Sequence, residues 1–211
     1  MILTYDFLEI PTISEDLINS FDNMPNDTYL KQKYCFRKRR YSKYKVEKGL
    51  KVTLMEGNIF SQDERFNKYL GNVVRSYEPV HKTCESFVKE YLEKNSEIMT
   101  EIIKGESTEI GIHQIRITTF NNNEGLPVPE GYHQDGFDYI LLIPIQQYGY
   151  SGGFHSIRYG SQDGPEILSK QIPNGQSIIL NDKYVYHYAS PIFAKYCDTE
   201  GYRDTIVVTI G

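Results

Sequence analysis

The chain has 211 residues, of which 39% are hydrophobic and 24% are charged, and its net charge is −5. This size fits one globular domain with a sizeable core, and the acidic balance gives no global argument for nucleic-acid binding. Three cysteines without a CxxC pair indicate reduced thiols, and the first residues lack the basic segment of a signal peptide. The longest apolar run, Ile140 to Ile145, is too short to cross a bilayer. We therefore expect a cytoplasmic protein without a membrane partner.

The first 105 residues are predicted to be mixed and mostly helical. Ser14 precedes two acidic residues, as expected for the start of a helix. Apolar residues between Phe66 and Tyr77 recur at spacings of three and four, which indicates one face of a helix. A second pattern of this kind runs from Phe87 to Ile102, and Gly105 would end that helix.

From Ile110 on, short β-branched and aromatic segments alternate with Gly, Asn, Asp and Pro, which is typical of strands and turns. The expected strands are 111–120, 133–146, 153–159, 166–172, 176–181, 184–189 and 203–210. Many short strands predict a sandwich or barrel. We therefore predict a single α+β domain over residues 1–211, with a mainly β jelly roll over 106–211 that is buttressed by helices within 1–105.

The segment His133-Gln134-Asp135, followed later by His187, is the most informative pattern in the chain. On a strand, His133 and Asp135 would point to the same face. Two imidazoles and one carboxylate on one side of a metal leave positions open, as in the facial triad of non-heme Fe(II) oxygenases. A catalytic zinc with water as its fourth ligand could use the same residues, and a plain core histidine is the alternative for His187.

Arg203 and Thr205 share one strand parity near the end of the chain. A guanidinium with a hydroxyl two residues further on makes a good receptor for a carboxylate. The alternative is an ion pair between Arg203 and an acidic residue at a sheet edge. Zinc would leave Arg203 without a role, so the combination favours iron with an anionic co-substrate.

This combination of His-x-Asp, a distal His and Arg-x-Thr resembles the Fe(II)/2-oxoglutarate-dependent dioxygenases, whose core is a double-stranded β-helix of the jelly-roll or cupin type. More narrowly, the chain is similar to the small bacterial branch that hydroxylates free amino acids, typified by L-isoleucine dioxygenase. The segments that carry the narrower similarity are 131–139, 151–153, 186–192 and 201–205.

The resemblance implies that His133, Asp135 and His187 hold Fe(II), that Arg203 and Thr205 hold 2-oxoglutarate, and that O2 is the second co-substrate. The implied reaction hydroxylates an unactivated side-chain carbon of a free L-amino acid, with succinate and CO2 as co-products. Which amino acid and which carbon react stays open, and so does desaturation as an outcome.

A buried free amino acid needs partners for both of its charges. Arg116, on the strand before the Gly- and Pro-rich loop 121–131, is a candidate for the carboxylate. Glu124, Glu130 and Asp138 are candidates for the ammonium. The loop itself could act as a lid or only as a connection.

Residues 31–45 contain eight basic side chains interleaved with aromatic ones. This pattern occurs on nucleic-acid-binding surfaces and leaves a second hypothesis open, an oxygenase that acts on a nucleic acid or a protein. A solvated strand or an anion contact near the pocket is favoured by the acidic balance of the whole chain. A third hypothesis, a non-catalytic jelly-roll binding protein, would not explain a complete triad together with Arg203.

Overall fold

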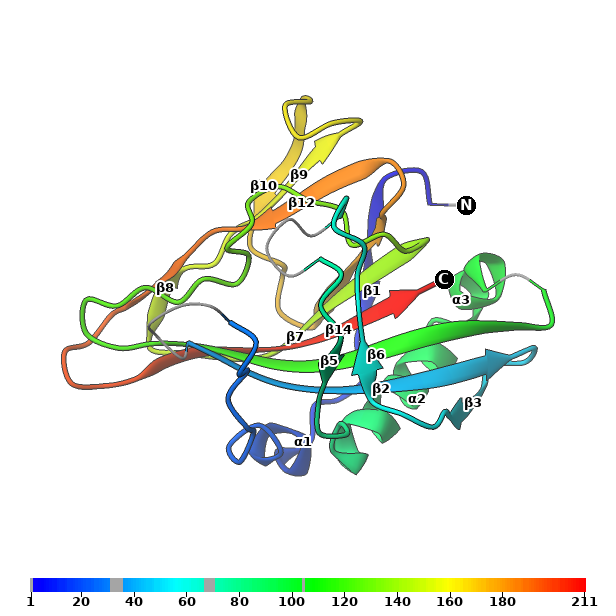
Figure 1. Cartoon of the computed structure of the whole chain (residues 1–211), viewed down its shortest axis with the longest axis horizontal. Coiled ribbons are helices and arrows are strands. Elements are labelled where there is room, and N and C mark those ends of the chain that lie inside the picture. The colour runs from blue at the N-terminus through cyan, green and yellow to red at the C-terminus, as the bar shows by residue number, and fades with distance from the viewer. Residues whose placement is uncertain (1, 31–35, 67–70, 104) are drawn as a thin grey trace.

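The computed structural model describes residues 2–30, 36–66, 71–103 and 105–211. It is mostly β, with one large antiparallel sheet, smaller sheets and few helices (Figure 1). Within the described residues, no helix is both long and apolar enough to span a membrane. The mainly β architecture predicted from the sequence is confirmed.

The large sheet has seven strands and runs across the middle of the molecule (Figure 1). In spatial order these are β1 (Tyr5–Glu9), β11 (Gln176–Asn181), β7 (Tyr139–Tyr148), β14 (Gly201–Ile210), β6 (Ser107–Thr119), β2 (Arg37–Glu47) and β3 (Lys51–Leu54). Every pairing in it is antiparallel. Strand β14 therefore lies at the centre of the sheet, paired with β7 on one side and with β6 on the other.

A three-stranded sheet lies above the large one in the view of Figure 1. It consists of β10 (Glu166–Lys170), β9 (His155–Tyr159) and β12 (Val185–Ala189). Two short pairs complete the β structure: β8 (Tyr150–Gly152) with β13 (Ile192–Ala194), and β4 (Ile59–Phe60) with β5 (Arg75–Ser76).

The helices of the described residues are α1 (Glu15–Asn19), α2 (Lys82–Lys94) and α3 (Ser96–Ile102). In Figure 1, α1 and α2 lie on the opposite side of the large sheet from β9 and β12, and α3 lies near the C-terminus. Ser14 caps α1 by accepting a hydrogen bond from the Leu17 N–H at 3.2 Å, as its position in the sequence predicts. Helix residues Phe87 and Tyr91 share one buried cluster with Ile206 of β14. The main apolar core therefore lies between the helices and the sheet.

The period-two alternation of a strand gives the large sheet two different faces. On β14, Ile206 and Val208 join the core beneath the helices, and we call this side the helix face. Arg203, Thr205 and Val207 line a cavity on the other side, which we call the pocket face. The same strand thus supplies apolar packing on one face and polar chemistry on the other.

The amino-terminal part differs from the prediction in three ways. Strands β1–β5 make it less helical than expected, and β2 covers residues 37–45 of the basic segment, for which a solvated strand was one of the two favoured interpretations. The helix predicted from Phe66 to Tyr77 lies partly outside the described residues, and its described part, 71–77, forms a turn and β5. The pattern from Phe87 to Ile102 forms two helices that meet at Asn95.

The strand predicted over 133–146 begins only at Tyr139. His133 forms an isolated bridge with His187, with N···O distances of 3.1 and 2.9 Å, and Asp135 lies in irregular backbone. The expectation that an extended strand aligns His133 with Asp135 is therefore wrong. Another group must place the carboxylate.

Candidate active site

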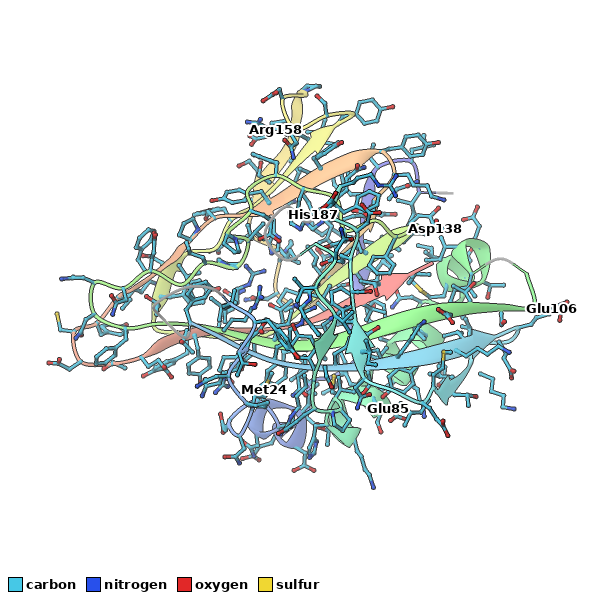
Figure 2. The ribbon with its side chains drawn as sticks, viewed as in Figure 1. Met24, Glu85, Glu106, Asp138, Arg158 and His187 are labelled. Atoms are coloured by element: carbon cyan, nitrogen blue, oxygen red, sulfur yellow. The ribbon has the colours of Figure 1, made fainter. Side chains whose placement is uncertain are left out.

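A cavity of about 140 Å³ lies between the pocket face of the large sheet and the strands β9 and β12. His133, Asp135 and His187 line it together with Arg203 and Thr205. Figure 2 shows His187 near the centre of the molecule, whereas Arg158 is at its upper edge. The structure thus brings the two predicted sites, metal and anion, into one cavity.

The ligand atoms of His133, Asp135 and His187 all lie within 4.8 Å of one another. The Asp135 carboxylate is 3.6 Å from His133 Nε2 through Oδ1 and 3.3 Å from His187 Nε2 through Oδ2. The His133 bridge to His187 holds the two rings side by side, with centroids 4.3 Å apart. These distances suit three ligands that converge on one metal position.

The nitrogens of this group also fit a metal. His133 Nδ1 donates to the Gly131 carbonyl at 3.0 Å, which leaves Nε2 with its lone pair toward the cluster. His187 Nε2 is buried and has no hydrogen-bond partner among the described residues. Burial acts to lower the pKa of His133, but the hydrogen bond and charge of Asp135 outweigh it and raise this pKa to about 9. The cluster therefore favours a positive charge at its centre.

Asp182, in the turn between β11 and β12, holds the loop that carries Asp135. Its carboxylate accepts hydrogen bonds from the backbone N–H groups of Asp135 at 2.9 Å, Gly136 at 2.7 Å and Phe137 at 3.2 Å. Gly136 has φ +87°, a conformation that glycine adopts without strain. Burial and the nearby Asp135 raise the pKa of Asp182. These hydrogen bonds to Asp182, which we call the Asp182 cap, position Asp135, a role that the sequence analysis had assigned to an extended strand.

Gln62 holds the Asp135 carboxylate from a second side, donating from Nε2 to Oδ1 at 2.8 Å. Sequence reasoning missed both Gln62 and Asp182. Asp182 comes shortly before His187 in the chain, but no spacing rule connects it to Asp135. Gln62 lies outside every predicted element.

Arg203 lies on the pocket face and is only 4% exposed. One guanidinium nitrogen donates to His155 Nε2 at 2.5 Å, and NH1 has no partner among the described residues. Burial lowers the pKa of Arg203, and burial followed by the charge of Arg203 holds the pKa of His155 well below its usual value. His155 is therefore a neutral acceptor. A buried cation that contacts no carboxylate is a ready receptor for an anion.

The four residues proposed for substrate charges are spread out. Arg116 lies on the helix face, where it donates to Asp204 at 2.7 Å through two nitrogens and to Asp22 at 3.0 Å. It therefore points away from the cavity and is not available to a substrate there.

Among the proposed ammonium partners, Glu130 lines the cavity. Glu124 is exposed and is not part of the cavity wall. Asp138 pairs with Lys183 at 2.5 Å on the surface. The structure thus places one of the four candidates, Glu130, at the site.

Four further cationic or titratable side chains line the cavity: Arg37, Arg39, Arg75 and His113. Arg39 NH2 lies 2.6 Å from His113 Nδ1. Burial, followed by the charge of Arg39, holds the pKa of His113 well below its usual value, so the imidazole is neutral. His113 is thus part of the cavity wall.

The fold of this chain was compared with those of solved protein structures. A bsmA homolog from Methylobium petroleophilum PM1 superposes with a TM-score of 0.78 at 22% identity, covering 92% of this chain and 78% of that one. IDO from Bacillus thuringiensis gives 0.72 at 20% identity, covering 97% and 90%. The Fe(II)/(alpha)ketoglutarate-dependent dioxygenase TqaL gives 0.69 at 12% identity, covering 99% and 82%. These similarities show a shared fold.

No curated protein sequence matches the chain significantly. The family model described as 2OG-Fe dioxygenase matches residues 18–209, which is most of the chain and includes every residue of the His-Asp-His cluster. The protein therefore belongs to the 2OG-Fe dioxygenase family, which uses Fe(II), 2-oxoglutarate and O2.

Proposed function

We propose that the protein hydroxylates an unactivated side-chain carbon of a free L-amino acid, with succinate and CO2 as co-products. The observation that carries this proposal is one cavity in which an open His-Asp-His cluster lies beside a buried arginine, Arg203, that has no carboxylate partner in the described part of the chain. A metal and an anionic co-substrate would satisfy both groups at once. A binding protein without catalysis would need neither feature.

His133, Asp135 and His187 would hold Fe(II), and Arg203 with Thr205 would hold the distal carboxylate of 2-oxoglutarate. When bound, the metal and 2-oxoglutarate supply the oxidising power that breaks an unactivated C–H bond with O2, one oxygen atom entering the product and the other succinate. The protein contributes orientation: Asp182 and Gln62 fix the Asp135 carboxylate, and His155 fixes the Arg203 guanidinium.

The walls of the cavity support a small substrate over a polymer. Most lining side chains, including His113 and Leu142, are buried within the protein, so a reacting group has to enter an enclosed space. Residues 31–35 of the basic segment lie outside the described residues. In its described part the cations do not form one exposed stripe: Arg37 and Arg39 line the cavity, while Lys43 and Lys45 lie at the surface. This division removes the main argument for a nucleic-acid substrate.

The test is a screen of the twenty common L-amino acids for substrate-dependent succinate formation with Fe(II), 2-oxoglutarate and O2. We expect one succinate per product, and a product mass that identifies hydroxylation or desaturation. The α-ammonium and α-carboxylate of the true substrate should both be required, because a site that pairs buried charges rejects analogues lacking them. Equal or better turnover of an N-acetylated, amidated or polymeric substrate would contradict the proposal.

A further inference from the structure

Two arginines of the cavity, Arg39 and Arg75, have no ion pair with any of the described residues. Arg37 and Arg39 extend from alternate positions of β2, and Arg75 extends from β5. All three line the cavity and all are buried, Arg39 at 8% exposure and Arg75 at 1%. We call Arg39 and Arg75 the arginine pair.

The arginine pair is not neutralised by the protein. Arg37 binds the buried carboxylate of Asp27 at 2.8 Å, but neither Arg39 nor Arg75 has an ion pair among the described residues. Arg39 contacts neutral His113, and Arg75 donates to the Gln62 side-chain oxygen at 3.1 Å. The Nε atoms of both are buried and have no hydrogen-bond partner among the described residues.

The surroundings of the arginine pair compensate its two buried positive charges only weakly. Both guanidinium groups lie over the Phe60 ring, with centroid distances of 5.0 Å for Arg39 and 4.6 Å for Arg75. Aromatic faces stabilise cations only modestly. Burial, followed by the charge of Arg39, lowers the pKa of Arg75. Two buried like charges next to each other cost free energy that an anion bound between them would recover.

This region is separate from the proposed 2-oxoglutarate site. Strand register aligns Arg203 of β14 with Ile117 of β6, and Ile117 with Arg37 of β2. Arg39 is likewise aligned with Thr205 through Ile115. Arg39 thus starts two strand spacings away from β14, which carries Arg203, roughly 10 Å. A 2-oxoglutarate held by the metal and Arg203 would leave Arg39 available for a different anion.

The arginine pair does lie next to the metal cluster. Gln62 accepts from Arg75 through its oxygen and donates to Asp135 Oδ1 through its nitrogen. One amide group therefore separates a cation of the pair from a metal ligand. A substrate anchored on the pair would have its neighbouring carbons beside the metal position.

We propose that the arginine pair binds the carboxylates of an acidic substrate, so that the amino acid hydroxylated here is a dicarboxylate such as L-aspartate, L-glutamate or L-2-aminoadipate. Glu130, which also lines the cavity, would pair with the ammonium. This assignment balances charge: with Arg37 and Asp27 cancelling, the pair and Glu130 leave one positive charge, which an acidic amino acid neutralises and an aliphatic one does not. The inference rests on the proposed function and names its substrate class.

The test compares each acid with its uncharged isostere. Binding of L-glutamate and L-glutamine, and of L-aspartate and L-asparagine, is measured by calorimetry on the protein with Fe(II) and 2-oxoglutarate under exclusion of O2. Succinate formation is then measured in air. We expect the acids to bind and turn over about 30-fold better than the amides, or more, as the loss of a buried charge partner implies.

Variants identify the cause of this preference. Arg39→Gln should weaken binding of the acids by about 30-fold or more and change amide binding little. Lys45→Gln removes a charge from the same strand, at an exposed position whose partner is Glu47, and should bind the acids like the wild type. If Arg39→Gln does not fold, Arg39→Lys keeps the charge but loses the planar fork, and should still weaken the acids selectively.

If the protein preferred an aliphatic amino acid and Arg39→Gln left this preference unchanged, the proposal of an acidic substrate would be refuted. The proposed amino-acid hydroxylase function would not be affected by this result. Binding and turnover of a capped peptide in place of any free amino acid would overturn both. Failure of every acid to bind the folded protein in calorimetry would also refute the role of the arginine pair.

Discussion

Replacing Arg203 by Leu tests the co-substrate site directly, because the change should affect 2-oxoglutarate affinity and folding stability to different extents. The guanidinium is buried, contacts neutral His155, and has no carboxylate partner in the described part of the chain. If 2-oxoglutarate supplies the missing anion, Arg203→Leu should damage ligand binding far more than folding. If Arg203 had only a structural role, the change would lower folding stability and leave 2-oxoglutarate binding largely unchanged.

The sizes of the two effects follow from the interactions that Arg203→Leu removes in the 2-oxoglutarate-bound and in the ligand-free protein. With 2-oxoglutarate bound, the change removes one partner of a buried charge pair, which costs about 2–5 kcal/mol and raises the Kd for 2-oxoglutarate about 30- to 5,000-fold. Without the ligand, no protein carboxylate loses its partner. The free energy of unfolding should then change by no more than about 1 kcal/mol, or rise, since an unpaired buried cation has been removed.

Arg116→Leu is the matched control. Arg116 lies on the neighbouring strand β6 but on the helix face, where it holds the buried Asp204 carboxylate at 2.7 Å. Breaking this pair should cost about 3–5 kcal/mol of folding free energy and leave the 2-oxoglutarate affinity of the folded protein within about two-fold of the wild type.

Urea unfolding and calorimetric titration with 2-oxoglutarate, in the presence of Fe(II) and without O2, measure the two effects on each variant. The reasoning would be refuted by an unchanged 2-oxoglutarate Kd in Arg203→Leu. It would equally be refuted by a loss of several kcal/mol in its ligand-free stability.

Three further predictions concern the metal. His187→Ala leaves two ligands and should abolish metal binding and succinate formation with an unchanged circular-dichroism spectrum; full activity would contradict the iron site. Asp182→Ala frees the backbone N–H groups that hold Asp135 and should weaken metal binding about 10- to 100-fold in titrations, whereas unchanged affinity would make the cap dispensable. Because Asp135 raises the pKa of His133 to about 9 and a ligating imidazole must be neutral, metal binding at pH 7 should release about one proton. Metal affinity should therefore fall as the pH decreases below 9. Calorimetry in buffers of different ionisation enthalpy measures the number of protons released on metal binding. A value of zero would show that His133 loses no proton when the metal binds.

Local rules predicted those parts of the molecule that local forces determine. Ser14 caps α1 because its side chain needs only the next turn of backbone. Arg203, Thr205 and Val207 share the pocket face because strand periodicity alone fixes it. These assignments depend on neighbours in the sequence, so a single chain contains enough information for them.

Long-range contacts determine the parts that were missed. The position of Asp135 depends on Asp182, which no spacing connects to it. The spacing of apolar residues after Phe66 resembles a helix, yet Val74 is exposed and Asn72 has φ +59°, which interrupts a right-handed helix.

The basic segment of β2 was difficult to assign for a different reason. Its alternation is present, but both faces carry cations: Arg37 and Arg39 line the cavity, whereas Lys38 and Arg40 take the other face of the strand. Lys43 and Lys45 have the same parity as Arg39 but lie further along the strand, at the surface. An alternation of polar with polar residues gives no hydrophobic signal. The inward arginines become recognisable only when the cavity they share with Arg75 is known.

The central place of β14 has a consequence for how the protein is made. Its neighbours β6 and β7 end at Thr119 and Tyr148, well before β14 begins at Gly201. At a synthesis rate of roughly 5–20 residues per second, the ribosome needs several seconds to reach the strand that joins them. During this interval both have an open edge, which is prone to pairing with other chains. The growing polypeptide should therefore depend on chaperones until β14 inserts, and this insertion also delivers Arg203 to the cavity.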